Sequence, residues 1–183
     1  MRRLAALLAC LFVGLTISPV VAIAQTTTPT ATSTKMAEGT RKDPIPRGQS
    51  VDLGDWTVEI VGYRQNANEI VATENQFNDP PAEGRQFVMA TMQITYHGTD
   101  IGNLSYLQFK AVGASNVAYT TYEDSCGVVP DDPFTISDIF TDGTVKVNYC
   151  WSVQTSDVKS LLIYGEVMLS FDDDPVFLNP RRN

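Results

Sequence analysis

The 183-residue chain has few of the residues that build common catalytic and metal sites. It has a single histidine, His97, which excludes a zinc site made from several histidines. It lacks the Gly-x-Ser-x-Gly turn that holds the nucleophile of many serine hydrolases. Ser156–Lys159 matches Ser-x-x-Lys, but the partner motifs of penicillin-recognising acyltransferases are missing. We therefore predict no catalytic residue and no cofactor, and we interpret His97 as an exposed turn residue.

Positive charge is also scarce, with 13 Lys and Arg against 21 Asp and Glu and a formal net charge of −8. No basic patch with interleaved aromatic residues is present, so nucleic acid and anionic membrane surfaces are poor partners. A pair of catalytic carboxylates, as in glycoside hydrolases, stays open at this point because only their separation in space identifies them.

Two acidic clusters could offer oxygen ligands to calcium. Asp131 and Asp132 precede Pro133, and residues 172–174 are three aspartates before Pro175. Neither cluster has the spaced Asp-x-Asp-x-Asp-Gly pattern, and an aspartate before proline also suits a turn. We predict turns at both places and no metal site.

The N-terminal residues have the pattern of an export signal. Arg2 and Arg3 precede the apolar run 4–17, and Ala22-Ile23-Ala24 provides a small-residue cleavage site. This pattern predicts a signal peptide over residues 1–24, and losing its two arginines takes the formal charge to −10. An uncleaved membrane anchor and a lipoprotein modified at Cys10 are the alternatives. On the main prediction the protein is secreted or lies at the cell surface, without membrane insertion.

Removal of Cys10 with the signal leaves two cysteines, Cys126 and Cys150. An even number of cysteines in an exported chain predicts a disulfide bond.

The residues after the signal change in character at about Gly48. Residues 25–47 are dominated by Thr, Pro, Ala and Ser, which bury too little apolar surface to offset the entropy of ordering. We predict a disordered linker over 25–47 and one immunoglobulin-like β-sandwich domain over 48–179.

Apolar and polar residues alternate in four runs, at residues 56–60, 88–96, 107–111 and 145–153. A period of two predicts half-buried antiparallel strands, and their number and spacing favour an all-β sandwich. No stretch has a helical stripe, so at most a turn is expected at 156–160. Cys150 alternates with Tyr149 and Trp151, which places the disulfide on an outer face of the sandwich.

The stretch 74–84, Glu-Asn-Gln-Phe-Asn-Asp-Pro-Pro-Ala-Glu-Gly, is interpreted as a structural connection. Its two prolines restrict the backbone, and Gly84 allows a turn into the next strand. Asn and Asp side chains suit hydrogen bonds to local backbone amides. Phe77 is expected to anchor the loop on the sandwich, while a cation site would use the same oxygens.

Three short stretches resemble a known family: Gly54–Val58, Glu83–Val88, and Asp142–Val145 leading into Tyr149–Trp151. They look like the bacterial exported immunoglobulin-like domains of unknown function related to the mycobacterial immunoprotective extracellular antigen. The resemblance implies an exported β-sandwich with no established catalytic residues.

We predict an exported, non-catalytic domain that binds an extracellular protein or an envelope component. A carboxylate-based extracellular hydrolase and a structural envelope domain without a specific ligand are the alternatives. An apolar pocket with two close carboxylates favours the hydrolase, and an exposed apolar surface favours binding.

The export prediction is tested by the intact mass of the protein recovered from culture medium. We expect a chain that begins at Gln25, because the Ala22-Ile23-Ala24 sequence fits signal peptidase. A chain that still begins at Met1, or one that carries lipid on Cys10, contradicts the prediction.

Overall fold

The computed structural model describes residues 38–168 and 174–182, and nearly all regular structure there is β. The nine strands of this part are β1 (Ile45–Pro46), β2 (Ser50–Leu53), β3 (Trp56–Arg64), β4 (Arg85–Tyr96), β5 (Leu107–Val112), β6 (Ala118–Thr120), β7 (Thr144–Gln154), β8 (Leu162–Val167) and β9 (Val176–Asn179). The helical pieces are α1 (Asn68–Glu74) and the 3-10 turns η1 (Leu104–Tyr106), η2 (Pro133–Thr135) and η3 (Val158–Ser160).

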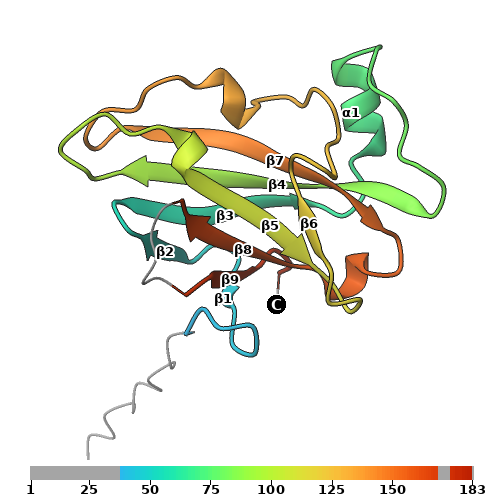
Figure 1. The fold of residues 1–183 in the computed structure, drawn as a ribbon, viewed down its shortest axis with the longest axis horizontal. Coiled ribbons are helices and arrows are strands. Elements are labelled where there is room, and N and C mark those ends of the chain that lie inside the picture. Colours follow the sequence, from blue (N-terminus) through green and yellow to red (C-terminus); the bar gives the residue numbers. More distant parts are fainter. Residues whose placement is uncertain (1–37, 169–173, 183) are drawn as a thin grey trace, which may run out of the picture. The chain divides into compact units, whose positions relative to one another are not determined.

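The strands form two packed sheets (Figure 1). The five-stranded sheet has the order β1-β9-β8-β5-β6, and the four-stranded sheet has the order β2-β3-β4-β7. Neighbouring strands are antiparallel except for β1 and β9, which are parallel. The four alternating runs of the sequence form β3, β4, β5 and β7. The predicted all-β sandwich is confirmed.

The core lies between the two sheets and consists of the inward side chains of each strand. Trp151 of β7 is fully buried there. The rings of Phe109 and Tyr149 meet edge to face with centroids 4.8 Å apart, so the two sheets are in direct aromatic contact.

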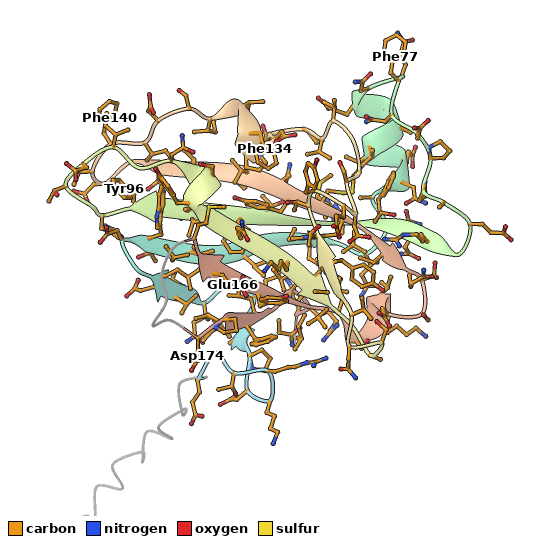
Figure 2. The ribbon with its side chains drawn as sticks, viewed as in Figure 1. Phe77, Tyr96, Phe134, Phe140, Glu166 and Asp174 are labelled. Carbon is orange, nitrogen blue, oxygen red and sulfur yellow. A yellow bond between two sulfur atoms is a disulfide. The ribbon has the colours of Figure 1, made fainter. Side chains whose placement is uncertain are left out.

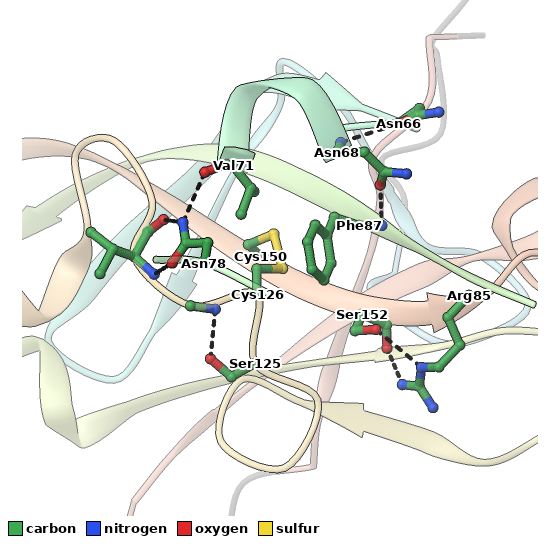
Figure 3. Close-up of a disulfide and its surroundings, with 12 residues drawn as sticks. Asn66, Asn68, Val71, Asn78, Arg85, Phe87, Ser125, Cys126, Cys150 and Ser152 are labelled. Atoms are coloured by element: carbon green, nitrogen blue, oxygen red, sulfur yellow. Dashed lines mark hydrogen bonds between the residues drawn. A yellow bond between two sulfur atoms is a disulfide. The ribbon is translucent and has the colours of Figure 1, made fainter. Parts of the chain in front are cut away.

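A second hydrophobic cluster covers the outer face of the four-stranded sheet (Figure 3). Its buried members come from α1 and its approach, from β4, from β7 and from the connection after β6, and they are Ala67, Val71, Phe87, Met89, Cys126, Val129 and Cys150. The disulfide joins Cys126 to Cys150, and their Cα atoms are 5.9 Å apart. The pairing and its location on an outer face are both as predicted.

The connection between β6 and β7, residues 121–143, runs along the outer edge of β7. The backbone N–H of Ser152 donates to the Asp124 carbonyl at 2.8 Å, and the N–H of Asn148 donates to the Asp131 carbonyl at 2.9 Å. The Asn148 amide also donates to the Pro130 carbonyl at 2.8 Å. This connection therefore occupies an edge that would otherwise be open to pairing with another strand.

The expectation that the chain contains no helix is wrong at α1. This helix has seven residues, and Val71 on its inner side is fully buried in the outer cluster. The Asn68 side chain accepts a hydrogen bond from the Phe87 N–H at 2.8 Å, which fastens the helix to β4. Packing, not propensity, stabilises so short a helix. No helix among the described residues is long and apolar enough to cross a membrane.

The folded domain begins before Gly48, so the predicted linker is too long at its C-terminal end. Ile45 is buried and pairs with Leu178 in the five-stranded sheet. The Arg41 side chain donates to the Gly113 carbonyl at 3.2 Å, which fastens the preceding residues as well. The predicted signal peptide 1–24 and residues 25–37 lie outside the described residues.

A buried carboxylate, Asp157, joins η3 to the turn between β5 and β6. Its side chain accepts hydrogen bonds from the Ser115 hydroxyl, from the Ser115 N–H at 3.1 Å and from the Tyr119 hydroxyl at 2.7 Å. Burial acts to raise the pKa of Asp157, but the hydrogen bonds from Ser115 and Tyr119 outweigh burial and hold the pKa below its usual value.

Replacing both Cys126 and Cys150 with alanine should lower the free energy of unfolding by about 2–5 kcal/mol. The bond closes a loop between residues 24 apart and lies in a packed cluster, so both chain entropy and packing are lost. Urea unfolding followed by circular dichroism measures the change. The β-rich spectrum should persist, and an unfolding curve that matches the wild type contradicts the prediction.

Asp157 should make stability depend on pH. Its folded pKa lies below the unfolded value of ~3.9, so its contribution is complete above that value and is lost as pH falls through the folded pKa. Asp157→Asn should cost about 1–3 kcal/mol near neutral pH, and this difference should shrink below about pH 4. Urea unfolding of both proteins across this range is the measurement. A difference that does not change with pH rejects the assignment.

Candidate functional site

A groove, here called the loop groove, lies between the loop 75–84 and residues 123–127. Its volume is about 550 Å³, and Phe87 and Ser152 contribute to its lining. One wall follows α1 in the sequence, and the other is the part of the connection that contains Cys126. Both walls are thus fixed to the outer cluster, one through α1 and the other through the disulfide.

Asn78 ties the two walls together. Its side-chain amide donates to the Val71 carbonyl at 2.8 Å and to the Val128 carbonyl at 2.7 Å, and its oxygen accepts from the Val128 N–H at 2.8 Å (Figure 3). Gly127 makes room for this contact, because a Cβ atom there would lie 2.3 Å from the Asn78 oxygen and the backbone φ is +85°. The loop 75–84 is therefore held in one position.

Phe77 does not anchor the loop, and that prediction is wrong. The side chain is 83% exposed and projects from the end of the loop, away from the sheets (Figure 2). The Phe77 N–H donates to the Asn75 side chain at 3.0 Å, as expected of a loop asparagine. Asn75 and Asn78 therefore hold the backbone of the loop, and the ring is left free for contact with solvent or a partner.

Arg85 lines the loop groove, and its side chain lies beside Ser152 (Figure 3). Its guanidinium contacts the Asp124 carboxylate and the Ser152 carbonyl, and its Nε donates to the Ser152 hydroxyl at 3.0 Å. The same group lies over the Tyr119 ring, 5.6 Å from the ring centroid. With these partners the arginine is a structural cation and not a free anion-binding group.

Two further carboxylates line the loop groove, those of Asp79 and Glu123. Neither forms an ion pair within residues 38–168 and 174–182. Because Arg85 is matched by Asp124, the groove has a net negative charge beside an exposed aromatic ring.

His97 lies where the sequence predicts, in an exposed turn at the end of β4. Its ring nitrogens lie 3.0 Å from the Thr57 hydroxyl and 3.3 Å from the Asp142 carboxylate. The Ser156–Lys159 stretch forms a turn and the start of η3, not the helix that acyltransfer would require.

The acidic cluster before Pro133 is a turn, as predicted. The Asp132 carboxylate accepts from the Phe134 N–H at 2.8 Å and caps η2. Asp172 and Asp173 lie outside the described residues. Within the described part of the chain, no three or more His, Cys, Asp and Glu side chains are grouped so that they could hold a metal ion.

Sequence reasoning singled out the loop 75–84 but not the groove beside it. Asn78 and Val128 are 50 residues apart, so no local pattern signals that they meet. The glycine at position 127 is a weak signal of a close approach, but the sequence does not say which residue approaches.

The chain is similar to solved β-sandwich structures at low identity. A conserved hypothetical protein from Bacillus anthracis has a TM-score of 0.43 and 9% identity, over 72% of this chain and 92% of that one. An uncharacterized β-sandwich protein from Clostridium difficile 630 has a TM-score of 0.46 and 14% identity, over 74% of this chain and 91% of that one. No protein-family model and no curated protein matches the chain. These similarities carry no argument about function, and the relation to the mycobacterial antigen stays a prediction.

Proposed function

We propose that this protein is an exported, non-catalytic domain that binds a protein or envelope component outside the membrane, and that the loop groove is the binding site. The single observation that carries the proposal is the exposure of Phe77 at the end of an ordered loop. A large aromatic side chain in this position contributes little to folding, whereas aromatic side chains dominate the energetics of many protein interfaces.

The loop is already fixed before any partner binds. Asn78 joins it to Val128 of the neighbouring wall through two hydrogen bonds and to Val71 of α1 through a third, and Pro80 and Pro81 restrict its backbone. Little conformational entropy is therefore lost when a partner contacts Phe77, and a preordered loop binds more tightly than a mobile one.

The charge of the groove indicates the chemistry of the partner. Asp79 and Glu123 favour a positively charged group beside the apolar contact with Phe77, and the whole chain has a formal net charge of −8. A basic segment that also carries an apolar side chain fits this surface best. A cation can also lie over the Phe77 ring.

The carboxylate hydrolase remains the alternative class, and no observation favours it. A general acid needs a carboxyl group whose pKa is raised towards neutrality. The buried carboxylate among the described residues is Asp157, and its hydrogen bonds lower its pKa.

Phe77→Ser should remove binding without weakening the fold. Because the side chain is 83% exposed, the free energy of unfolding should change by no more than about 0.5 kcal/mol. The amount of partner captured from culture medium and envelope extract of the source organism should fall roughly 30-fold, as expected for an interface residue worth about 2 kcal/mol. Capture on immobilised protein with quantitative mass spectrometry is the measurement.

Val117→Ser is the matched control, since Val117 is also an exposed apolar residue, at 63%, but lies in the turn between β5 and β6 outside the loop groove. It should capture the same partner as the wild type. Equal capture by wild type, Phe77→Ser and Val117→Ser rejects the loop groove and favours a structural domain without a specific ligand.

A further inference from the structure

A second groove, here called the apolar groove, lies between three exposed apolar side chains. Tyr122 is 91% exposed, Phe134 is 75% exposed and Met168 is 43% exposed, and all three line the groove. Leu104 and Leu107 also line it but are buried, so they close the groove with an apolar floor. Its volume of about 510 Å³ lies within the ~300–1,000 Å³ range of small-molecule sites.

The sides of the apolar groove are held in place by the fold. The Met168 N–H donates to the Tyr106 carbonyl at 2.7 Å, which fastens the end of β8 beside η1. The Phe134 N–H donates to the Asp132 carboxylate at 2.8 Å, which fixes η2 on the other side. Exposed apolar side chains gathered around a hollow mark a site of interaction, because they contribute little to the core of the free protein.

The backbone groups at the floor of the groove are already paired within the chain. The Leu107 N–H donates to the Leu104 carbonyl, and the Phe109 carbonyl accepts from the Trp151 ring N–H at 3.3 Å. A peptide laid in the groove would lose hydrogen bonds to water and find no replacement for them on this floor. An alkyl chain has no N–H or C=O group to satisfy, so it is the occupant that these walls suit.

The charges around the groove limit the head group that such a chain can carry. The Lys110 ammonium is paired with Glu166 at 2.6 Å. Glu123 also lines the groove and forms no ion pair within the described residues. The unmatched charge is therefore negative, and it repels a carboxylate or phosphate head. Ser105, at the exposed side of the lining, offers a hydroxyl to an uncharged polar head.

We propose that the apolar groove binds one alkyl chain of a lipid whose head group is not anionic. The chain lies between Tyr122, Phe134 and Met168, and the head group stays at the open side in contact with water. Removal of methylene groups from water supplies the affinity. This inference goes beyond the proposed function, because it concerns a different groove and a different class of ligand and does not use Phe77.

The probes are hexyl, octyl and decyl maltoside, each used below the concentration at which it forms micelles. Titration into nitrogen-15-labelled protein should shift the backbone amide signals of Tyr122, Phe134 and Met168. The affinity should rise about fourfold for each methylene group that enters the groove. Maltose alone should not shift these signals, because the head group contributes little to binding.

Undecanoate tests the charge argument, because its tail has the same length as that of decyl maltoside but its head is a carboxylate. Repulsion by Glu123 should make undecanoate bind more weakly than decyl maltoside. In Glu123→Gln this difference should become smaller. Tighter binding of undecanoate than of decyl maltoside by the wild type contradicts the inferred class of head group.

Phe134→Ser is the decisive variant. The side chain is largely exposed, so the melting temperature should change little, whereas the affinity for decyl maltoside should fall about tenfold with the lost apolar contact. Phe140→Ser is the matched control, because Phe140 is a phenylalanine of the same connection, 66% exposed, that does not line the apolar groove. That variant should bind decyl maltoside as the wild type does.

The proposal is overturned if the affinity does not depend on chain length, or if Phe134→Ser binds decyl maltoside as tightly as the wild type. Equal losses in Phe134→Ser and Phe140→Ser would show non-specific binding to exposed rings and also overturn it. If no maltoside binds but Phe134→Ser captures less protein from culture medium than Phe140→Ser, the groove is a protein contact and the proposal is wrong. Phe77→Ser should bind decyl maltoside normally, so a failure of the proposed function is distinguished from a failure of this inference.

Discussion

The disulfide between Cys126 and Cys150 fixes the connection after β6 to the outer face of the four-stranded sheet, and the loop groove depends on that connection. The residues around Cys126 form one wall of the loop groove. Without the bond, this long connection would be held mainly by hydrogen bonds along the edge of β7. The disulfide thus fixes the geometry of one wall of the loop groove, although the segment that forms this wall has almost no regular structure.

The outer hydrophobic cluster helps the disulfide to hold the connection after β6 in place, because both cysteines are packed within it. An antiparallel sheet commonly leaves one face to water, but here α1 and the disulfide cover apolar side chains such as Phe87 on the second face of the four-stranded sheet. Because of this added layer, the candidate binding surface lies on the loops above the outer cluster and not on the side chains between the two sheets. Exposed aromatic side chains in that layer, Phe77 and Phe134 among them, can change without disturbing the packing between the sheets.

The sequence predicts the features that depend on local periodicity. Alternation identified β3, β4, β5 and β7 and placed Cys150 on the face opposite Trp151. The prediction from alternation failed where residues distant in the sequence determine the local structure. The helix α1 is stabilised by β4, and the short β1 forms because Ile45 pairs with Leu178. Phe77 was expected to be buried because composition alone does not tell an anchor from a contact residue. The loop groove could not be predicted, since segments far apart in the chain form its walls.

The parallel pairing of β1 with β9 has a mechanical consequence. The chain joins the domain at the outer edge of the five-stranded sheet, where only Ile45 and Pro46 pair with β9 and the Gly39 carbonyl accepts one more hydrogen bond, from the Phe177 N–H. A pulling force on the N-terminus acts first on these bonds and on the hydrogen bonds from Arg41 to Gly113 and Asn116. Their rupture would release residues 38–47 and lengthen the tether by roughly 35 Å, at about 3.5 Å per residue. The β1–β9 pair would therefore separate before the force reaches the loop groove, which lies on the other sheet.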